Sequence, residues 1–301
     1  CRIPDGMRWE VILVANACTD RTRDATAPFA ARLPLIYLEE PRQGSSNARN
    51  RGVAEARGAL ILFTDDDVRP CSNWVALYWS VYQATGNHHY FGGPLRSEFE
   101  DGWRPEPELL RVANRSVAGF DYGPRARALG PGEEFLEANW ACPAPALKVV
   151  GGYSPQLGLD GSTSRRRVGE GLDLMERLNR HGLTPHYVPE AEVRHFVPRR
   201  KVTVRAIGRA YRAQGVYAAR RPPPSFYLDK VPGLRAVAQE ERAVGAGLRL
   251  WSAFVNALRD WLVARLAGRK GYAEYASLQF WVGCIEVHAG DLMQRLRRRR
   301  R

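Results

Sequence analysis

The amino-acid sequence predicts an α/β fold, with a mainly parallel sheet flanked by helices and a helical extension at the C-terminal end. Two observations predict it. Short apolar runs alternate with helical patterns between residues 9 and 63, and the pattern changes to long helical segments after Lys201. The alternation is typical of βαβ units and a parallel sheet. The 301 residues, 45% of them apolar, can bury the core of one large or two small domains, which excludes a disordered chain.

Each element of the first part follows from its composition. The runs at 9–14, 35–38 and 59–63 are short and rich in Val, Ile and Leu, which predicts buried strands. Helical patterns at 22–32 and 47–57 fill the intervals between these strands. Because proline lacks a backbone donor, Pro28 is expected to kink or shorten the first helix.

Polar residues directly follow two of these strands. Asn16 and Asp20 come after the first strand, and three aspartates at 65–67 come after the third. Ligands of open α/β sheets bind beyond the carboxyl ends of the strands. Asp65 and Asp67 stand two apart on an extended segment, so their side chains are expected to point the same way. Such carboxylates suit Mg²⁺ or Mn²⁺ together with substrate phosphates; a solvated acidic turn is the alternative.

The C-terminal part is strongly basic. From Phe196 onward 22 basic residues stand against 7 acidic ones, a net charge of +15, which leaves −2 for the first 195 residues. Helices are predicted at 202–220, 234–266 and 273–296, with a stiff connector at the three prolines 222–224. The two parts are therefore expected to meet different partners.

The middle helix of this part carries an apolar stripe with arginines beside it. Such a helix suits the interface of an anionic membrane, and packing on the rest of the chain or on a second subunit is the alternative. The polybasic tail, Arg295 with residues 297–301, suits acidic lipid headgroups or nucleic acid. Nucleic acid is not expected as a partner, because no helix-turn-helix or base-stacking motif accompanies the tail. The stripe consists of Leu250, Trp251, Phe254, Val255, Leu258, Trp261, Leu262 and Leu266.

Cysteine usage and the ends of the chain bear on its compartment. The five cysteines are widely spaced and form no Cys-x-x-Cys pair, so neither a disulfide framework nor structural zinc is expected and a reducing cytoplasm fits best. No apolar run approaches the length of a membrane span. The sequence begins with Cys1 and enters a strand within ten residues, so a missing upstream segment is expected.

Several motifs, taken in order, resemble family 2 glycosyltransferases with the GT-A fold. The resemblance covers residues 9–200, about two thirds of the chain, and predicts a domain over 1–200 followed by a basic amphipathic helical extension over 201–301. The first strand of that family and its following helix are absent here; a missing upstream piece, a misplaced start, or another segment that fills the gap would each explain this. The motifs lie at 14–20, 44–52, 56–70, 137–141, 150–153, 169–174 and 193–195, with Arg177 and Gly182 between the last two.

On the donor side, the resemblance implies a UDP- or GDP-sugar bound with Mn²⁺ or Mg²⁺. Its positions assign the nucleotide to Asn16, Asp20, Arg49, Asp65 and Asp66. They assign the metal to Asp67, with Asp65 and His195 as further ligands. Alternatives remain open for two of these residues: Arg49 could pair locally on a helix surface, and His195 could be a hydrogen-bonded structural residue.

On the acceptor side, the resemblance implies an inverting transfer to a hydroxyl of a glycan or lipid-linked acceptor. Gly93, Asn139 and Trp140 fall near the sugar or the acceptor, although core packing would equally explain Trp140. The family motif carries two adjacent carboxylates where this chain has Glu170 followed by Gly171. Glu170 is therefore the first candidate for the base, and Asp173 is the second.

The resemblance predicts a metal-dependent enzyme of glycan or cell-envelope polysaccharide synthesis, in the cytoplasm or peripheral at the inner face of the cell membrane. The glycine at 171 and the absent first strand leave one alternative, a non-catalytic nucleotide-sugar-binding or scaffold protein of the same fold.

Overall fold

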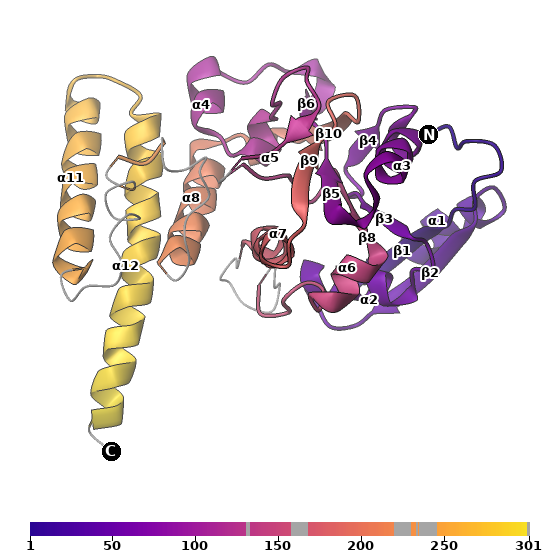
Figure 1. The fold of residues 1–301 in the computed structure, drawn as a ribbon. Coiled ribbons are helices and arrows are strands. Elements are labelled where there is room, and N and C mark those ends of the chain that lie inside the picture. The colour runs from indigo at the N-terminus through magenta and orange to yellow at the C-terminus, as the bar shows by residue number, and fades with distance from the viewer. Residues whose placement is uncertain (131–132, 158–167, 220–229, 233, 235–245, 300–301) are drawn as a thin grey trace. The chain divides into compact units, whose positions relative to one another are not determined.

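The computed structural model describes residues 1–130, 133–157, 168–219, 230–232, 234 and 246–299, and it divides into two compact units (Figure 1). The first unit comprises Cys1–Glu98 and Gly119–Phe196, and the second comprises Phe99–Ala118 and Val197–Arg301. Phe99–Ala118 thus belongs to the second unit, although it lies within the first predicted domain. The domain boundary at residue 200 stays a prediction.

The first unit contains alternating strands and helices, followed by shorter strands. The predicted strands and helices between residues 9 and 63 are confirmed, with ends that differ by up to two residues. Pro28 lies inside the first helix, which ends at Ala30. The elements are β1 Val11–Asn16, α1 Thr22–Ala30, β2 Leu35–Glu40, α2 Ser45–Glu55, β3 Leu60–Phe63, β4 Val68–Pro70, α3 Trp74–Thr85, the 3₁₀ turn Gly86–His88, β5 His89–Gly92, β6 Leu95–Phe99, β7 Arg127–Ala128, β8 Trp140–Pro143, α6 Ala144–Val149, α7 Glu170–Arg180, β9 Thr184–Tyr187 and β10 Val193–Val197.

The strands of the described residues form three sheets, ordered β1-β2, β4-β10-β6 and β3-β8-β5-β9-β7. The α/β class is confirmed, but the sheets are mixed rather than mainly parallel. The pair β1·β2 is parallel, as the βαβ pattern predicts, and β5·β9, which lies outside that pattern, is parallel as well. Strand β8 lies between β3 and β5 and runs antiparallel to both. Since β8 comes long after both neighbours in the chain, the alternation near the N-terminus gave no information on its direction.

Aromatic side chains fill the core around β8. The ring of Trp140 stacks on that of Phe63 with centroids 4.7 Å apart, and Tyr90 meets it edge-on. Trp140 is fully buried. This packing fixes the end of β3, from which the aspartate segment leaves.

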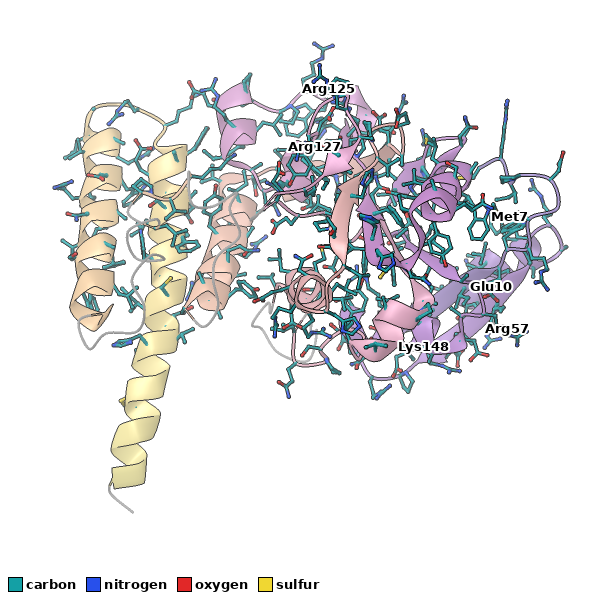
Figure 2. The ribbon with its side chains drawn as sticks, in the orientation of Figure 1. Met7, Glu10, Arg57, Arg125, Arg127 and Lys148 are labelled. Atoms are coloured by element: carbon teal, nitrogen blue, oxygen red, sulfur yellow. The ribbon has the colours of Figure 1, made fainter. Side chains whose placement is uncertain are left out.

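One hydrogen bond joins the side chain just before β1 to the backbone just after α2. The amide of Arg57 donates to Glu10 Oε1 at 2.7 Å, and Figure 2 labels both residues beside the β1·β2 pair. This hydrogen bond ties the chain just after α2 to the chain just before β1.

The second unit is helical. Helices α8 and α12 confirm the predicted helices at 202–220 and 273–296. The prolines 222–224 and residues 235–245 of the predicted helix 234–266 lie outside the described residues, as do Arg300 and Arg301. The elements are the 3₁₀ turn Glu100–Gly102, α4 Pro107–Val112, α5 Arg115–Ala118, the 3₁₀ turn Arg199–Lys201, α8 Val204–Ala218, α11 Ala246–Leu266 and α12 Tyr272–Arg299.

The apolar stripe of α11 divides between two faces. Phe254, Leu258 and Trp261 pack against the core of the second unit. Trp251, Val255, Leu262 and Leu266 are exposed, Leu266 at 88%. One side of the predicted stripe, which includes Leu250, thus faces the core together with the buried Ala257 and Ala264, and the adjacent side faces solvent. Across the described residues, no helix has both the length and the apolarity needed to cross a membrane.

Helices α8 and α12 approach each other through glycines. A Cβ atom at Gly215 would lie 1.9 Å from the carbonyl oxygen of Phe280, and one at Gly283 would lie 2.1 Å from that of Arg212. The obstructing atoms belong to the backbone, so they cannot rotate away. Only glycine permits this spacing of the two helices.

Gly283→Val is therefore expected to destabilise the second unit by about 3 kcal/mol, the upper range for overpacking. Gly290→Ala in the same helix is the matched control, because a Cβ at Gly290 meets nothing within 4 Å. That control should be neutral or slightly stabilising, since alanine favours helix. Urea unfolding followed by circular dichroism measures both, and equal midpoints for the two variants would contradict the close approach.

Candidate active site

The aspartate segment after β3 is held by pairing between β4 and β10. In this antiparallel pair Val68 lies opposite His195, and the amide of Phe196 donates to the carbonyl oxygen of Asp67 at 2.7 Å. The pairing brings His195 Nε2 to 3.3 Å from Asp67 Oδ2. Two residues that are 128 positions apart thus meet at the end of β3.

The side chains of this segment differ in exposure. Asp65 and Asp67 keep 39% and 33% of their side chains exposed, whereas that of His195 is 7% exposed. Asp66 faces solvent. The Nδ1 atom of His195 is buried and has no hydrogen-bond partner among the described residues. The segment therefore offers solvent-accessible carboxylates next to an imidazole that is largely shielded.

These groups fit a divalent cation whose remaining coordination positions are filled by a bound ligand and water. Carboxylate oxygens and imidazole nitrogen suit Mn²⁺, and carboxylates suit Mg²⁺. Within the part of the chain that the structure describes, no group of three or more His, Cys, Asp or Glu side chains stands ready to hold a metal. Mg²⁺ commonly takes one or two carboxylates and fills its other positions with phosphate oxygens and water, which agrees with Asp67 and its neighbours Asp65 and His195.

A buried arginine on α2 gathers three carboxylates beside this segment. Arg49 Nη1 lies 2.7 Å from Glu137 Oε1 and 3.7 Å from Glu170 Oε1, while Nη2 lies 3.2 Å from Asp65 Oδ1. The side chains of Arg49, Glu137 and Glu170 are 17%, 21% and 10% exposed. We call Arg49, Asp65, Glu137 and Glu170 the Arg49 cluster. It joins α2, the end of β3, the segment before β8 and the start of α7.

Burial controls the protonation of this cluster. Desolvation raises the pKa of Glu137 to about 8; the negative charges of Glu170 and Asp65 add to the rise, and Arg49 and the Gly171 amide oppose it. Desolvation disfavours the charge on Arg49, but attraction to Glu137, Asp65 and Glu170 outweighs it, so the pKa of Arg49 is raised. The site therefore combines a permanent cation with a carboxyl group that titrates near neutral pH.

The raised pKa of Glu137 makes stability depend on pH. In the unfolded chain this carboxyl loses its proton near its ordinary value of 4.5, whereas in the folded chain it keeps the proton until about pH 8. Rising pH therefore favours the unfolded state over this interval, by at most about 1.4 kcal/mol per pH unit. In Glu137→Gln this contribution is absent, so the stability of the variant relative to the wild type should rise between about pH 5 and pH 8. Urea unfolding at both pH values measures the difference, and a flat or falling difference would refute the shift.

The two predicted base candidates lie on one turn of α7 but have different surroundings. Glu170 Oε1 accepts from Ser45 Oγ at 3.0 Å within the Arg49 cluster. The Asp173 side chain is 7% exposed, and its Oδ2 accepts from Arg177 Nε and Nη2 at 3.0 and 2.9 Å. Arg177 also donates to the carbonyl oxygens of Val150 and Gly152. Asp173 therefore braces α7 to the segment after α6.

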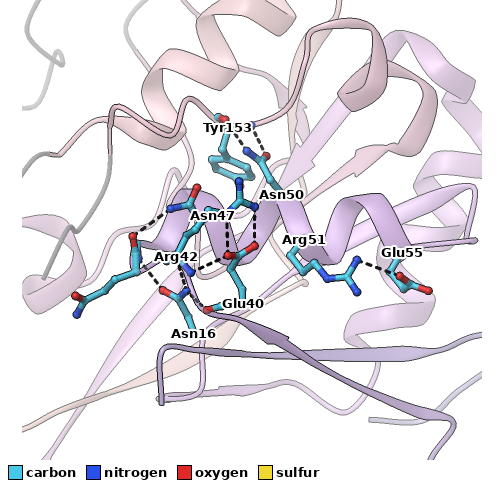
Figure 3. A network of polar contacts seen from close by, with 10 residues as sticks. Asn16, Glu40, Arg42, Asn47, Asn50, Arg51, Glu55 and Tyr153 are labelled. Carbon is cyan, nitrogen blue, oxygen red and sulfur yellow. Dashed lines mark hydrogen bonds and ion pairs between the residues drawn. The ribbon is translucent and has the colours of Figure 1, made fainter. Parts of the chain in front are cut away.

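The neighbour of Arg49 on α2 anchors the same segment. Asn50 Nδ2 donates to the carbonyl oxygen of Tyr153, and Asn50 Oδ1 accepts from the Tyr153 amide, both at 2.7 Å (Figure 3). The guanidinium of Arg49 lies over the Tyr153 ring, 5.4 Å from its centroid. Because Asn50 fixes the rotation of α2, Arg49 is held toward the carboxylates.

Asn16 serves the loop that leads into α2. Its Nδ2 donates to the carbonyl oxygens of Glu40 and Arg42 at 2.9 and 2.8 Å, and its Oδ1 accepts from the Gly44 amide at 2.8 Å (Figure 3). Gly44 has a φ of 130°, in the range that favours glycine. Asn16, predicted at the nucleotide, thus directly sets the path of this loop.

Asp20 is the other residue after β1 that is predicted to bind the nucleotide, and its hydrogen bonds are to Thr22 rather than to the Arg49 cluster. Its carboxylate is exposed and accepts from the amide and the hydroxyl of Thr22 at the start of α1. These hydrogen bonds, the hydroxyl first, lower the pKa of Asp20.

The three predicted acceptor residues lie in the core. Asn139 is fully buried: its Oδ1 accepts from Trp74 and Tyr78, and its Nδ2 donates to the carbonyl oxygens of Pro94 and Ala191. A Cβ at Gly93 would lie 2.1 Å from the Ala191 oxygen. These contacts, with the buried Trp140 ring, position the backbone between β5 and β8.

Glu137 is the site residue that was not singled out from the sequence. It stood within the motif 137–141, but nothing in that motif indicates that its carboxyl group reaches α2. A charged residue in the apolar run that leads into a buried strand was the available signal.

Comparisons with known proteins agree with the resemblance. Residues 2–130 match the family model described as Glycosyl transferase family 2, which confirms the recognition based on motifs. The chain is 32% identical to glycosyltransferase AglE of Haloferax volcanii over 81 residues, 26% of this chain and 27% of that protein. It is 37% identical over 62 residues to the putative teichuronic acid biosynthesis glycosyltransferase TuaG of Bacillus subtilis, 20% of this chain and 24% of that protein. The matched segments thus span about a quarter of each relative.

A solved structure shares the fold. The mannosyltransferase PcManGT of Pyrobaculum calidifontis, in complex with GDP-Man and Mn²⁺, superposes with a TM-score of 0.52 and 18% sequence identity, covering 94% of this chain and 78% of the other. The GT-A type fold predicted from the motifs is confirmed.

Proposed function

We propose that this chain, whose residues 2–130 match glycosyl transferase family 2, transfers a sugar from a nucleoside diphosphate donor to an acceptor hydroxyl with inversion. One observation carries the proposal. The exposed carboxylates of Asp65 and Asp67 lie between His195 on β10 and Arg49 on α2, so one short segment contacts both a candidate metal ligand and a buried acid–base cluster.

The donor side follows from the fit of these groups to a cation. Asp67, with Asp65 and His195, would hold Mn²⁺ or Mg²⁺. When bound, the metal stabilises the negative charge that develops on the leaving diphosphate. The Pyrobaculum mannosyltransferase structure holds GDP-Man and Mn²⁺, which supports a nucleotide-sugar and a divalent metal for this chain.

The acceptor side requires a base, since a sugar hydroxyl is a weak nucleophile until its proton is removed. The Arg49 cluster supplies such carboxyl groups, those of Glu137 and Glu170, and Asp65 connects it to the segment that carries the candidate metal ligands. A single displacement inverts the anomeric centre, and it needs only one such base. From its position in the motif, Glu170 is the first candidate for this base. The ion pair of Asp173 with Arg177 instead suits a structural role, which is to hold α7 against the segment after α6.

The acceptor is proposed to be a glycan or a lipid-linked sugar of the cell envelope. The name of the Bacillus subtilis relative, a putative teichuronic acid biosynthesis glycosyltransferase, supports envelope polymer synthesis. The exposed stripe of α11, with the exposed Arg259 and Arg265 beside it, supports peripheral attachment to an anionic membrane surface from the cytoplasm.

Calorimetric titration of the chain with UDP and with GDP, each with and without Mn²⁺, tests the proposal. Release of nucleotide from a panel of UDP- and GDP-sugars is then measured. Metal-dependent binding followed by release supports the transferase. Binding without release favours the non-catalytic nucleotide-sugar-binding protein, which Gly171 in place of a carboxylate would explain. Absence of binding to either nucleotide refutes both.

A further inference from the structure

A side chain at position 171, at the start of α7, would have to displace the side chain of Glu137. A Cβ atom at Gly171 would lie 2.5 Å from Glu137 Cγ and 2.6 Å from Glu137 Cδ. The backbone of Gly171 does not require glycine, because its φ is not in the positive range. The glycine is thus explained by the side chain of Glu137, which occupies the space beside it.

Glu137 brings a carboxyl group to the place where the motif lacks one. Its Oε2 lies 3.0 Å from the Cβ position of residue 171, and its Oε1 is fixed by Arg49 at 2.7 Å. The carboxyl group lies at the N-terminal end of α7, an 11-residue helix, where the helix dipole favours a negative charge.

The two carboxylates in the first turn of α7 are more buried than that of Glu137. Glu170 is engaged by Ser45 and has a side chain only 10% exposed, against 21% for Glu137. Asp173 is held by Arg177. Of Glu137, Glu170 and Asp173, Glu137 has the most exposed side chain, and its position is fixed by Arg49.

We propose that Glu137 replaces the carboxylate missing at position 171 and is the base that deprotonates the acceptor; this rests on the proposed function. The proton of the acceptor hydroxyl passes to Glu137 as the oxygen bonds to the anomeric carbon of the donor. The bond from that carbon to the diphosphate breaks, and its electron pair leaves with the nucleoside diphosphate. Base catalysis is most effective when the pKa of the base lies near the working pH.

The test exchanges the carboxylate between the two positions. Four variants are compared with the wild type: Glu137→Gln, Glu137→Gly, the double variant Glu137→Gly/Gly171→Asp, and Glu170→Gln. Glu137→Gly opens the space that a side chain at 171 needs. Each variant is measured for release of nucleotide from the sugar donor that the wild type hydrolyses and for calorimetric binding of the same nucleoside diphosphate with Mn²⁺. Thermal unfolding confirms that each variant is folded.

We expect Glu137→Gln and Glu137→Gly to lower turnover by about 100-fold or more and to leave nucleotide affinity within about threefold, since a base acts on the acceptor rather than on binding of the donor. The double variant should recover at least about tenfold over Glu137→Gly, a gain that a merely structural role of Glu137 would not give. Should Glu137→Gln fail to fold, the double variant still decides.

Turnover of Glu137→Gln within about threefold of the wild type overturns the proposal. So does a double variant no more active than Glu137→Gly while Glu170→Gln alone abolishes turnover, because Glu170 is then the base. Both results leave the transferase function standing. A wild type that binds nucleotide but releases none from any donor overturns the proposed function as well.

Discussion

Asp67→Ala is expected to abolish the Mn²⁺-dependent part of UDP or GDP binding and to lower donor turnover by about 100-fold or more. Among the described residues, Asp67 is the acidic residue that pairs with His195, with its Oδ2 atom 3.3 Å from the Nε2 atom of the histidine. The variant loses the carboxylate that strand pairing places beside His195 and that solvent can reach, so the metal would lose its first candidate ligand. Calorimetry with and without Mn²⁺, followed by nucleotide release, measures the two effects.

Asp24→Ala is the control for this variant, because Asp24 is an exposed aspartate on α1. It should bind and turn over as the wild type does. Wild type treated with a chelator should reproduce the behaviour of Asp67→Ala. If Asp67→Ala keeps its metal-dependent affinity, the metal is held elsewhere, and the assignment of Asp67 and His195 is wrong.

Arg49→Met is expected to have the largest effect on stability. It removes the cation shared by Glu137, Asp65 and Glu170, so Asp65 and Glu170 lose a compensating charge and Glu137 loses the group that opposes the rise of its pKa. Breaking a buried ion pair on one side typically costs about 3–5 kcal/mol. Turnover should fall as well, since the cluster loses the contact that fixes the Glu137 carboxyl group. Urea unfolding and nucleotide release measure the two losses.

Arg51→Met on the same helix is the matched control. Arg51 forms an i,i+4 pair with Glu55 at 3.4 Å, with both side chains a third or more exposed, and such pairs contribute about 0.3–0.5 kcal/mol. Adding Glu137→Gln to Arg49→Met should restore part of the stability, because the folded double variant no longer has to hold a proton on residue 137 that the unfolded chain releases near the ordinary value of 4.5. Equal losses for Arg49→Met and Arg51→Met would show that Arg49 is not the centre of a buried cluster.

Much of the donor side could be predicted from the sequence. Apolar runs located β1, β2 and β3, and the ends of strands in an α/β fold are where polar residues gather. Asp65 and Asp67 were found in this way, and the position of Arg49 near the start of a helix indicated an anion site. Each of these features depends on residues that are close together in the sequence, so a local sequence pattern is enough to predict it.

The acceptor side could not be predicted to the same depth. Asn139 and Trp140 belong to a motif with catalytic associations, but their burial depends on Trp74, Tyr78 and Phe63, which come from other elements. The role of Glu137 depends on the absence of a side chain at Gly171, 34 positions later. A relation between an acid and an empty space elsewhere in the chain leaves no periodic signal in one sequence.

The antiparallel pairing of β4 with β10 limits how the length of this chain can vary. Along β10 the odd positions Val193, His195 and Val197 are buried and the positions between them are exposed. A single residue inserted into the strand before His195 would turn the imidazole outward and present Arg194 or the inserted residue to Asp67 instead. Insertions of two residues would keep the correct face. Homologous sequences that retain the histidine should therefore differ in length here by even numbers, a parity rule that a sequence survey can check.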